Sequence, residues 1–231
     1  MNIGLAFFHG WGLSGTFWSP LRAAMPDYPH AVIDRGYFGG TSTTPWHQAD
    51  QWVAIGHSKG WADALLYPTR QKDAPTWRAT ISLCGFTHFC ARHPEDAGQA
   101  RRVVERMVKV FSKAPHEVLS DFLTRCELQA FSPSPEADTS AVWDLTHLQS
   151  DLAALIDMDV SDGLKQRPLR HLALAAQDDV IVSPALSEAT WANAPEAELA
   201  WHPTGGHALG HAHADWCAQQ IRRFVNGLAH G

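Results

Sequence analysis

Long apolar runs are absent from this chain of 231 residues, and so is any excess of positive charge. No apolar stretch approaches the roughly 18–20 residues that a membrane-spanning helix needs, which argues against a transmembrane segment. The net charge of −6 would repel phosphate groups, so no nucleic-acid partner is expected. Charged residues make up only 18% of the chain and apolar residues 45%, a balance typical of one folded domain with a substantial core.

Cysteine is sparse and widely spaced. The four residues, Cys84, Cys90, Cys126 and Cys217, include no C-x-x-C pair, which indicates reduced thiols in a cytoplasmic protein. The apolar residues 1–8 lack a basic segment and a cleavage site, so we expect no removable signal peptide. Tryptophan, in contrast, is abundant, and ten of them predict either large-area core packing or an aromatic pocket for an apolar substrate.

Short apolar runs alternate with helical patterns along most of the chain, which favours β-α-β units and a parallel sheet. Helices are expected over residues 16–25, over 58–67 with an end at Pro68, from Pro184 onward, and over 212–228. Together these elements predict an α/β fold with a doubly wound, mostly parallel sheet of about six strands. The expected strands are residues 2–8, 30–34, 52–56, 77–83, 169–176 and 198–201.

Residues 85–162 interrupt that alternation. They show amphipathic helical patterns over 95–112, 115–126 and 139–156, with a Pro/Ser-rich break at 132–135. Because no linker separates this segment, we expect it to be a helical lid inserted into a single domain spanning residues 1–231. Placed at the carboxyl edge of the sheet, it would cover the pocket.

The strongest local signal is the G-H-S-K-G sequence at residues 56–60, which fits G-x-S-x-G between a predicted strand and a predicted helix. A serine at such a cramped turn needs small neighbours on both sides. The turn lifts its hydroxyl above the sheet and directs the helix N-terminus at developing negative charge. Ser58 is therefore the candidate nucleophile.

A serine nucleophile needs a positioned base, and position along the chain selects His207 from fourteen histidines. It follows the last predicted strand, and the two glycines before it let the backbone carry the imidazole back over Ser58. His211 and His213 lie nearby, but no acidic or thiolate partner at matching spacing accompanies them, so no metal site is predicted.

An acid that orients the histidine is expected after the strand before last. Asp178 and Asp179 both stand there, and spacing to Val182 favours Asp179. The oxyanion of an acyl-transfer intermediate needs two backbone N–H donors. One would come from Lys59, directly after the serine, and the other from Trp11 in the glycine-rich turn after the first strand.

These motifs resemble the α/β-hydrolase superfamily and, within it, the pimeloyl-acyl-carrier-protein methyl ester esterases of biotin synthesis. The resemblance is carried by residues 8–13, the turn at Ser58, residues 89–92, the Asp179 loop, and residues 206–211 continuing to 215–217. It implies an esterase that needs no cofactor and cleaves the methyl ester of a pimeloyl chain carried on acyl carrier protein. It also implies basic lid residues facing the acidic carrier, and the candidates on one helix face are Arg102, Arg106, Lys109 and Lys113. That basic face can equally be an ordinary solvated surface.

The chain departs from the superfamily pattern in three ways. It starts at the strand that is usually third, so the first two strands are expected to be missing. Only 17 residues separate Asp34 from Trp52, so residues 36–40 and Pro45 should cover that sheet edge as a loop. Lys59 stands where an apolar residue is common, which places a charge near the pocket.

Ester hydrolysis through an acyl-enzyme is thus the predicted activity. Two alternatives remain open: a general short-chain carboxylesterase or thioesterase acting on free small molecules, and a non-catalytic binding protein of the same fold. The aromatic residues expected to line an apolar acyl channel, besides Trp11, are Phe86, Phe89, Phe111, Phe122 and Trp143.

Overall fold

A computed structural model describes residues 2–93, 95–131, 143–165, 169–192, 194 and 196–228. Its centre is a sheet of six strands in the order β2-β1-β3-β4-β5-β6, and every neighbouring pair is parallel. This confirms the predicted α/β fold. The strands are β1 (Ile3–Phe8), β2 (His30–Ile33), β3 (Gln51–His57), β4 (Trp77–Leu83), β5 (Arg170–Ala176) and β6 (Glu198–His202).

The strand order reverses next to β1. From β1 the chain runs outward to β2, then returns to place β3 on the other side of β1. In open α/β sheets such a switch point leaves a crevice at the carboxyl ends of the strands, where ligands bind. Trp11 follows β1 and Ser58 follows β3, so both residues lie at this switch point.

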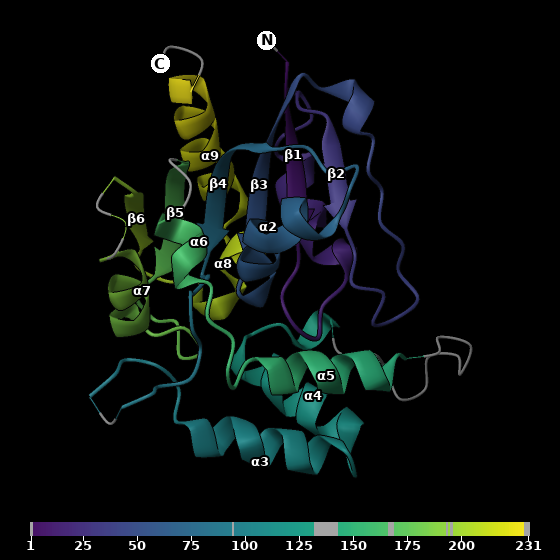
Figure 1. The fold of residues 1–231 in the computed structure, drawn as a ribbon, viewed down its shortest axis with the longest axis vertical. Helices are drawn as coiled ribbons and strands as arrows, with labels where there is room; N and C mark the ends of the chain where they lie inside the picture. The colour runs from purple at the N-terminus through teal and green to yellow at the C-terminus, as the bar shows by residue number, and fades with distance from the viewer. Residues whose placement is uncertain are drawn as a thin grey trace.

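Helices cover both faces of the sheet (Figure 1). The longer helices on the two faces, α2 and α9, each bury one apolar side against the strands. One face carries α2 (Lys59–Arg70), α6 (Ser161–Lys165) and α7 (Pro184–Trp191). The other carries the 3-10 turn η1 (Gly15–Trp18), α1 (Ser19–Ala23), α8 (Leu209–Ala212) and α9 (Ala214–Leu228).

A third group of helices lies beyond the carboxyl ends of the strands, at the end of the molecule opposite the start of β1 (Figure 1). This helical layer connects β4 to β5. It comprises α3 (Arg101–Phe111), α4 (Pro115–Arg125), the 3-10 turn η3 (Gln129–Phe131) and α5 (Leu145–Ala154). None of the helices in the described ranges is both long and apolar enough to cross a bilayer.

The predicted helix boundaries were wrong in this layer. The helix expected from residue 95 begins at Arg101, because the preceding backbone pairs with itself: Ala91 donates to Gln99 and Gln99 donates to Phe89. The helix expected from residue 139 is described from Leu145, where Asp144 caps it by accepting from the amide of His147. Residues 139–142 and the predicted break at 132–135 lie outside the described residues.

The predicted end of α2 at Pro68 was also wrong, since the helix continues to Arg70. A proline in a helix has no N–H for the carbonyl four residues earlier, here that of Ala64. The indole of Trp77 on the neighbouring strand β4 donates to that carbonyl at 2.7 Å instead. A side chain from the sheet thus replaces the missing helical bond.

The edge of the sheet beyond β2 is covered by a loop, as the short spacing predicts. Between β2 and β3 the chain forms only a three-residue 3-10 turn, η2 (Trp46–Gln48), and Thr43 bridges antiparallel to Val32. Asp34 organises the start of this loop by accepting from the amides of Gly15 and Gly36. The loop also carries Arg35 and Tyr37 toward the helical layer.

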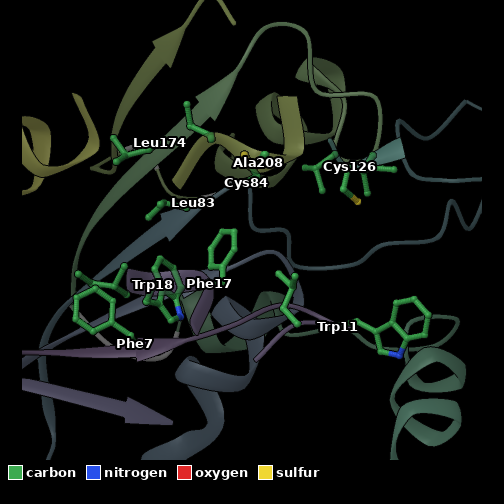
Figure 2. Packing of buried hydrophobic residues seen from close by; sticks show 14 of the residues in the cluster. Phe7, Trp11, Phe17, Trp18, Leu83, Cys84, Cys126, Leu174 and Ala208 are labelled. Atoms are coloured by element: carbon green, nitrogen blue, oxygen red, sulfur yellow. The ribbon is translucent and has the colours of Figure 1, made fainter. Parts of the chain in front are cut away.

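Aromatic side chains fill the core behind β1 and β3. Phe17 and Trp18 from η1 pack edge-to-face against each other and beside Phe7. Figure 2 shows Trp11 apart from this group, with its indole directed toward a helix. Trp18 thus serves core packing, while Trp11, which is also buried, lies after β1 where the strand order reverses.

The bond from Trp77 to the Ala64 carbonyl gives a test. Replacing Trp77 by Phe should lower the free energy of unfolding by about 1–3 kcal/mol, because a buried carbonyl loses its donor. Urea denaturation measures this change. In the Trp77→Phe background, Pro68→Ala restores a backbone donor to the same carbonyl and should recover part of the loss. No recovery would show that the Trp77→Phe cost comes from lost packing alone.

Candidate active site

Ser58 occupies a strained turn between β3 and α2. Its φ of 54° and ψ of −131° are unusual for a residue with a side chain, and its neighbours explain how the turn is tolerated. A Cβ on Gly56 would collide with the backbone of Trp61, and one on Gly60 would collide with the carbonyls at the end of β1. Both glycines of the motif are thus required by close backbone approach.

His207 and Asp179 form a buried pair beside this turn. Nδ1 of His207 lies 2.9 Å from Oδ2 of Asp179, and both side chains are about 1% exposed. The other carboxylate oxygen accepts from the amides of Ile181 and Val182 at 2.8 and 2.9 Å. Because a carboxylate only accepts, Nδ1 carries the proton and Nε2 is left as the basic nitrogen of the neutral ring. Within the described residues that Nε2 is buried and has no hydrogen-bond partner.

The environment favours an ionised Asp179. Burial alone would raise its pKa, but His207 and the two backbone amides outweigh burial and lower the pKa. Asp178, the alternative in the sequence, is turned elsewhere: its Oδ1 accepts from the amide of Gly206 at 2.8 Å. Asp178 therefore fastens the loop that carries the histidine, while Asp179 contacts the imidazole.

His57 connects the serine turn to the histidine loop, a role that the sequence reasoning missed. Its Nε2 donates to the backbone carbonyl of His207 at 2.9 Å, and the two rings lie 4.7 Å apart. Burial, followed by the proximity of His207, lowers the pKa of His57 to about 3, so its ring stays neutral at ordinary pH. The sole local signal is its place directly before Ser58.

The two residues predicted to supply the oxyanion amides lie on either side of the turn. Lys59 is the first residue of α2, so its N–H has no acceptor within the helix. Trp11 follows the end of β1, next to Gly10, where a Cβ would come within 3.2 Å of the Ser58 Cβ. The Lys59 side chain does not enter the pocket near Trp11, because Asp63 holds its ammonium at 2.8 and 3.0 Å.

A small cavity of about 30 Å³ lies beside the Trp11 indole. Of the predicted aromatic residues, Phe89 and Phe122 line it, with Phe122 packed edge-to-face on Trp11 at 5.0 Å. Phe111 contacts Trp11 but does not line the cavity, and Phe86 packs behind Phe89. Trp143 lies elsewhere, against Phe38 and His116.

A wider groove of about 300 Å³ opens between α3 and α4 on the outside of the helical layer. It shares four lining residues with the inner cavity: Val103, Met107, Phe122 and Arg125. Arg102, Arg106, Lys109 and Lys113 are all exposed on or just after α3. Of these four, Arg106 also lines the groove. Among the described residues, none of the four has an ion-pair partner.

A buried ionic cluster on the opposite side of the turn was not predicted. Asp151 of α5 accepts from Arg35 and Tyr37 and lies 3.4 Å from the Lys59 ammonium. Spacing alone could have suggested only the Lys59–Asp63 pair, which is four residues apart on one helix. Arg35 and Asp151 are 116 residues apart and leave no local pattern.

One group within the described residues has the geometry of a metal site: ligand atoms of Cys84, Asp179 and His207 lie within 4.8 Å of one another. Its chemistry does not favour a metal. Burial raises the pKa of the Cys84 thiol well above its usual value, whereas a metal ligand must be a thiolate. The carboxylate and imidazole are already bonded to each other. His211 and His213 are not part of this group.

Comparison with known proteins places these features in context. No family model matches the chain. A pimeloyl-[acyl-carrier protein] methyl ester esterase from Xanthomonas campestris pv. campestris is 26% identical, over 97% of this chain and 95% of its own length. Solved structures share the fold at low identity. An esterase from Exiguobacterium antarcticum (16% identical) and a bromoperoxidase from Bacillus anthracis (17%) both have a TM-score of 0.80 and match 98% of this chain and 92% of theirs.

The structural neighbours share the fold of this chain, which has a parallel six-stranded sheet and a serine at the turn between a strand and a helix. They also fit the similarity to the curated esterase, which extends along almost the whole sequence. The chain therefore has the fold of the α/β-hydrolases and resembles, in sequence, the pimeloyl-acyl-carrier-protein methyl ester esterases.

Proposed function

We propose that this protein is a serine carboxylesterase that uses Ser58 as nucleophile, His207 as general base and Asp179 as the residue that orients His207. The buried Asp179–His207 pair carries the proposal. Its proton on Nδ1 leaves Nε2, which has no hydrogen-bond partner among the described residues, as a base beside the turn that holds Ser58 in a strained backbone conformation. Strain of this kind concentrates at functional sites.

The reaction follows from these roles. Ser58 Oγ attacks the ester carbonyl as Nε2 of His207 takes the hydroxyl proton, and the amides of Trp11 and Lys59 stabilise the oxyanion. Collapse of the intermediate breaks the ester C–O bond, and the alcohol leaves with the proton from His207. Water, deprotonated by His207, then attacks the acyl-enzyme, and the acid departs as Ser58 regains its proton. Asp179 stabilises the imidazolium that forms in each step.

As the substrate, we propose the methyl ester of a pimeloyl chain on acyl carrier protein. The similarity to the curated esterase suggests it, and the helical layer fits it. The groove between α3 and α4 runs from exposed Arg106 and Arg125 to side chains that also line the cavity beside Trp11. A basic entrance suits an acidic carrier, and an apolar channel suits its acyl chain. Helices α3 to α5 would then act as the lid of a single-domain enzyme.

The inner cavity of about 30 Å³ has room for one or two water molecules rather than an acyl chain. Binding therefore requires side chains to move, and Met107 and Phe122 stand between the groove and Trp11. Methionine is flexible enough to permit such repacking. Acyl chains longer than a few carbons would thus bind with a rearrangement of the α3–α4 contact.

Labelling with a fluorophosphonate probe tests the enzyme class. The wild-type protein should be phosphonylated at Ser58, and Ser58→Ala should not react, as read by intact mass and peptide mapping. Heat-unfolded protein is the control for non-specific reaction. If the folded wild-type protein does not label, it is a binding protein of this fold and the esterase proposal is wrong.

The choice between the two aspartates can be tested by a matched pair of variants. Asp179→Asn should reduce kcat by about 10³–10⁴, because an amide facing Nδ1 favours the wrong tautomer of His207. Asp178→Asn keeps an oxygen for the Gly206 amide and should retain most activity. Both kcat values can be measured on a p-nitrophenyl ester. Equal losses in the two variants would contradict the role given to Asp179.

If basic residues of α3 bind the acidic carrier, reversing their charge should affect turnover of a carrier-linked ester but not of a free ester. The charge reversals Arg102→Glu and Arg106→Glu, made together, should raise KM for the carrier-linked pimeloyl methyl ester by about tenfold and leave p-nitrophenyl ester turnover unchanged. Lys72→Glu with Arg223→Glu is the control, since both residues are exposed outside the helical layer and the net charge changes equally. Faster wild-type turnover of free esters, with no effect of the reversals, would favour a general carboxylesterase.

A further inference from the structure

The side chains of both proposed oxyanion residues hold the same helix. The Trp11 indole donates to the backbone carbonyl of Leu148 at 2.8 Å, in a buried position. The Lys59 ammonium lies 3.4 Å from Oδ1 of Asp151. Leu148 and Asp151 are three residues apart and therefore lie on one side of α5. One face of α5 thus spans the two chain segments that would supply the oxyanion amides.

Asp151 is the centre of this attachment. Its Oδ2 accepts from the Nε of Arg35 at 3.0 Å, from the Arg35 Nη2 and from the Tyr37 hydroxyl, while Oδ1 faces Lys59. The start of α5 is tied to the same loop, because the amide of Asp144 donates to the carbonyl of Tyr37 at 2.9 Å. The helix is therefore fixed at several points rather than resting on an apolar surface alone.

The side chains that form this attachment are buried and charged. The side chains of Lys59 and Asp151 are 5% and 10% exposed. Burial alone would raise the pKa of Asp151, but Lys59 and Arg35 outweigh burial and lower it, so the carboxylate is ionised. Two cations, Lys59 and Arg35, face two anions, Asp63 and Asp151. Removing one charge from such a group leaves the others incompletely compensated.

An oxyanion site depends on the separation of its donors. Each N–H must lie about 2.7–3.1 Å from the position that the oxyanion will occupy. Here one donor belongs to the turn after β1 and the other to the first turn of α2. The strands that precede these two segments, β1 and β3, pair with each other in the sheet. On the side away from the sheet, α5 joins the two segments through the side chains of Trp11 and Lys59.

We propose that Asp151 is a positioning residue: by holding α5 across Lys59 and the Arg35–Tyr37 loop, it sets the spacing of the Trp11 and Lys59 amides for catalysis. This inference rests on the proposed esterase function. It also assigns a purpose to the lysine that follows Ser58. Lys59 does not line the cavity beside Trp11. Its ammonium serves to anchor the helix rather than to bind substrate.

The experiment compares two carboxylates that both bind Lys59. Asp151→Asn weakens the attachment to α5. Asp63→Asn removes a charge from the same group, since Asp63 pairs with Lys59 within α2 and lies 3.6 Å from Arg35, but it leaves the bonds between Asp151 of α5 and its partners in place. Asp151→Asn should lower kcat on a p-nitrophenyl ester at least about tenfold with KM little changed, because only the oxyanion contacts of the transition state are affected. Asp63→Asn should keep a kcat close to that of the wild type. Thermal unfolding of both variants checks that they are folded.

A second measurement isolates the oxyanion site. A trifluoromethyl ketone forms an adduct with Ser58 that carries an oxyanion, and its Ki should rise in Asp151→Asn in proportion to the loss of kcat. Lys59→Met keeps the backbone amide but removes the ammonium, and it should reproduce both effects. The double variant should be no worse than the more affected single one, because the two residues act through one contact.

The outcomes separate this inference from the function on which it rests. If wild-type protein hydrolyses esters and binds the ketone but Asp151→Asn matches Asp63→Asn in kcat and Ki, then Asp151 has no positioning role and the esterase assignment stands. If the Asp151→Asn loss appears in KM or in unfolding temperature alone, the residue is merely structural. If wild-type protein neither turns over esters nor binds the ketone, the proposed function itself fails.

Discussion

The close approach of α2 to the end of β1 is the constraint on which the site depends. At Gly60 the helix backbone lies directly against the carbonyls of Phe8 and His9, and at Gly56 the strand lies directly against Trp61. There is no room for a side chain at either position. This contact forces Ser58 into its positive-φ turn and brings the residues after β1 and β3 together at the switch point of the sheet. The loop after β5, which carries Asp179, and the loop after β6, which carries His207, then need only reach over that point.

Features that depend on residues close together in the chain could be predicted from the sequence. The alternation of apolar runs gave six strands, the G-x-S-x-G spacing gave the serine turn, and the glycines before His207 indicated a loop able to return over it. The choice of Asp179 over Asp178 depended on the next few residues. The structure supplies the reason for the difference, since the amide of Gly206 binds Asp178 while the imidazole binds Asp179.

Contacts between distant segments could not be predicted in this way. The continuation of α2 past Pro68 depends on an indole from the neighbouring strand, a donor that no helix propensity includes. The start of α3 depends on backbone pairing between residues near 90 and 99. Asp151 and Arg35 meet across 116 residues of sequence, and either one alone in the sequence is an unremarkable charged residue. Such placements follow from packing rather than from pattern.

The bond between the His57 ring and the His207 carbonyl joins residues 150 apart in the chain. It has a consequence for the order in which the molecule can form. Contacts of such long sequence separation are slow to close during folding, because the intervening chain must first be ordered. During synthesis the strands around Ser58 leave the ribosome well before the segment that bears the histidine. The turn at Ser58 can therefore fold early around its own glycines, while the complete candidate site exists only after the last strand has joined the sheet.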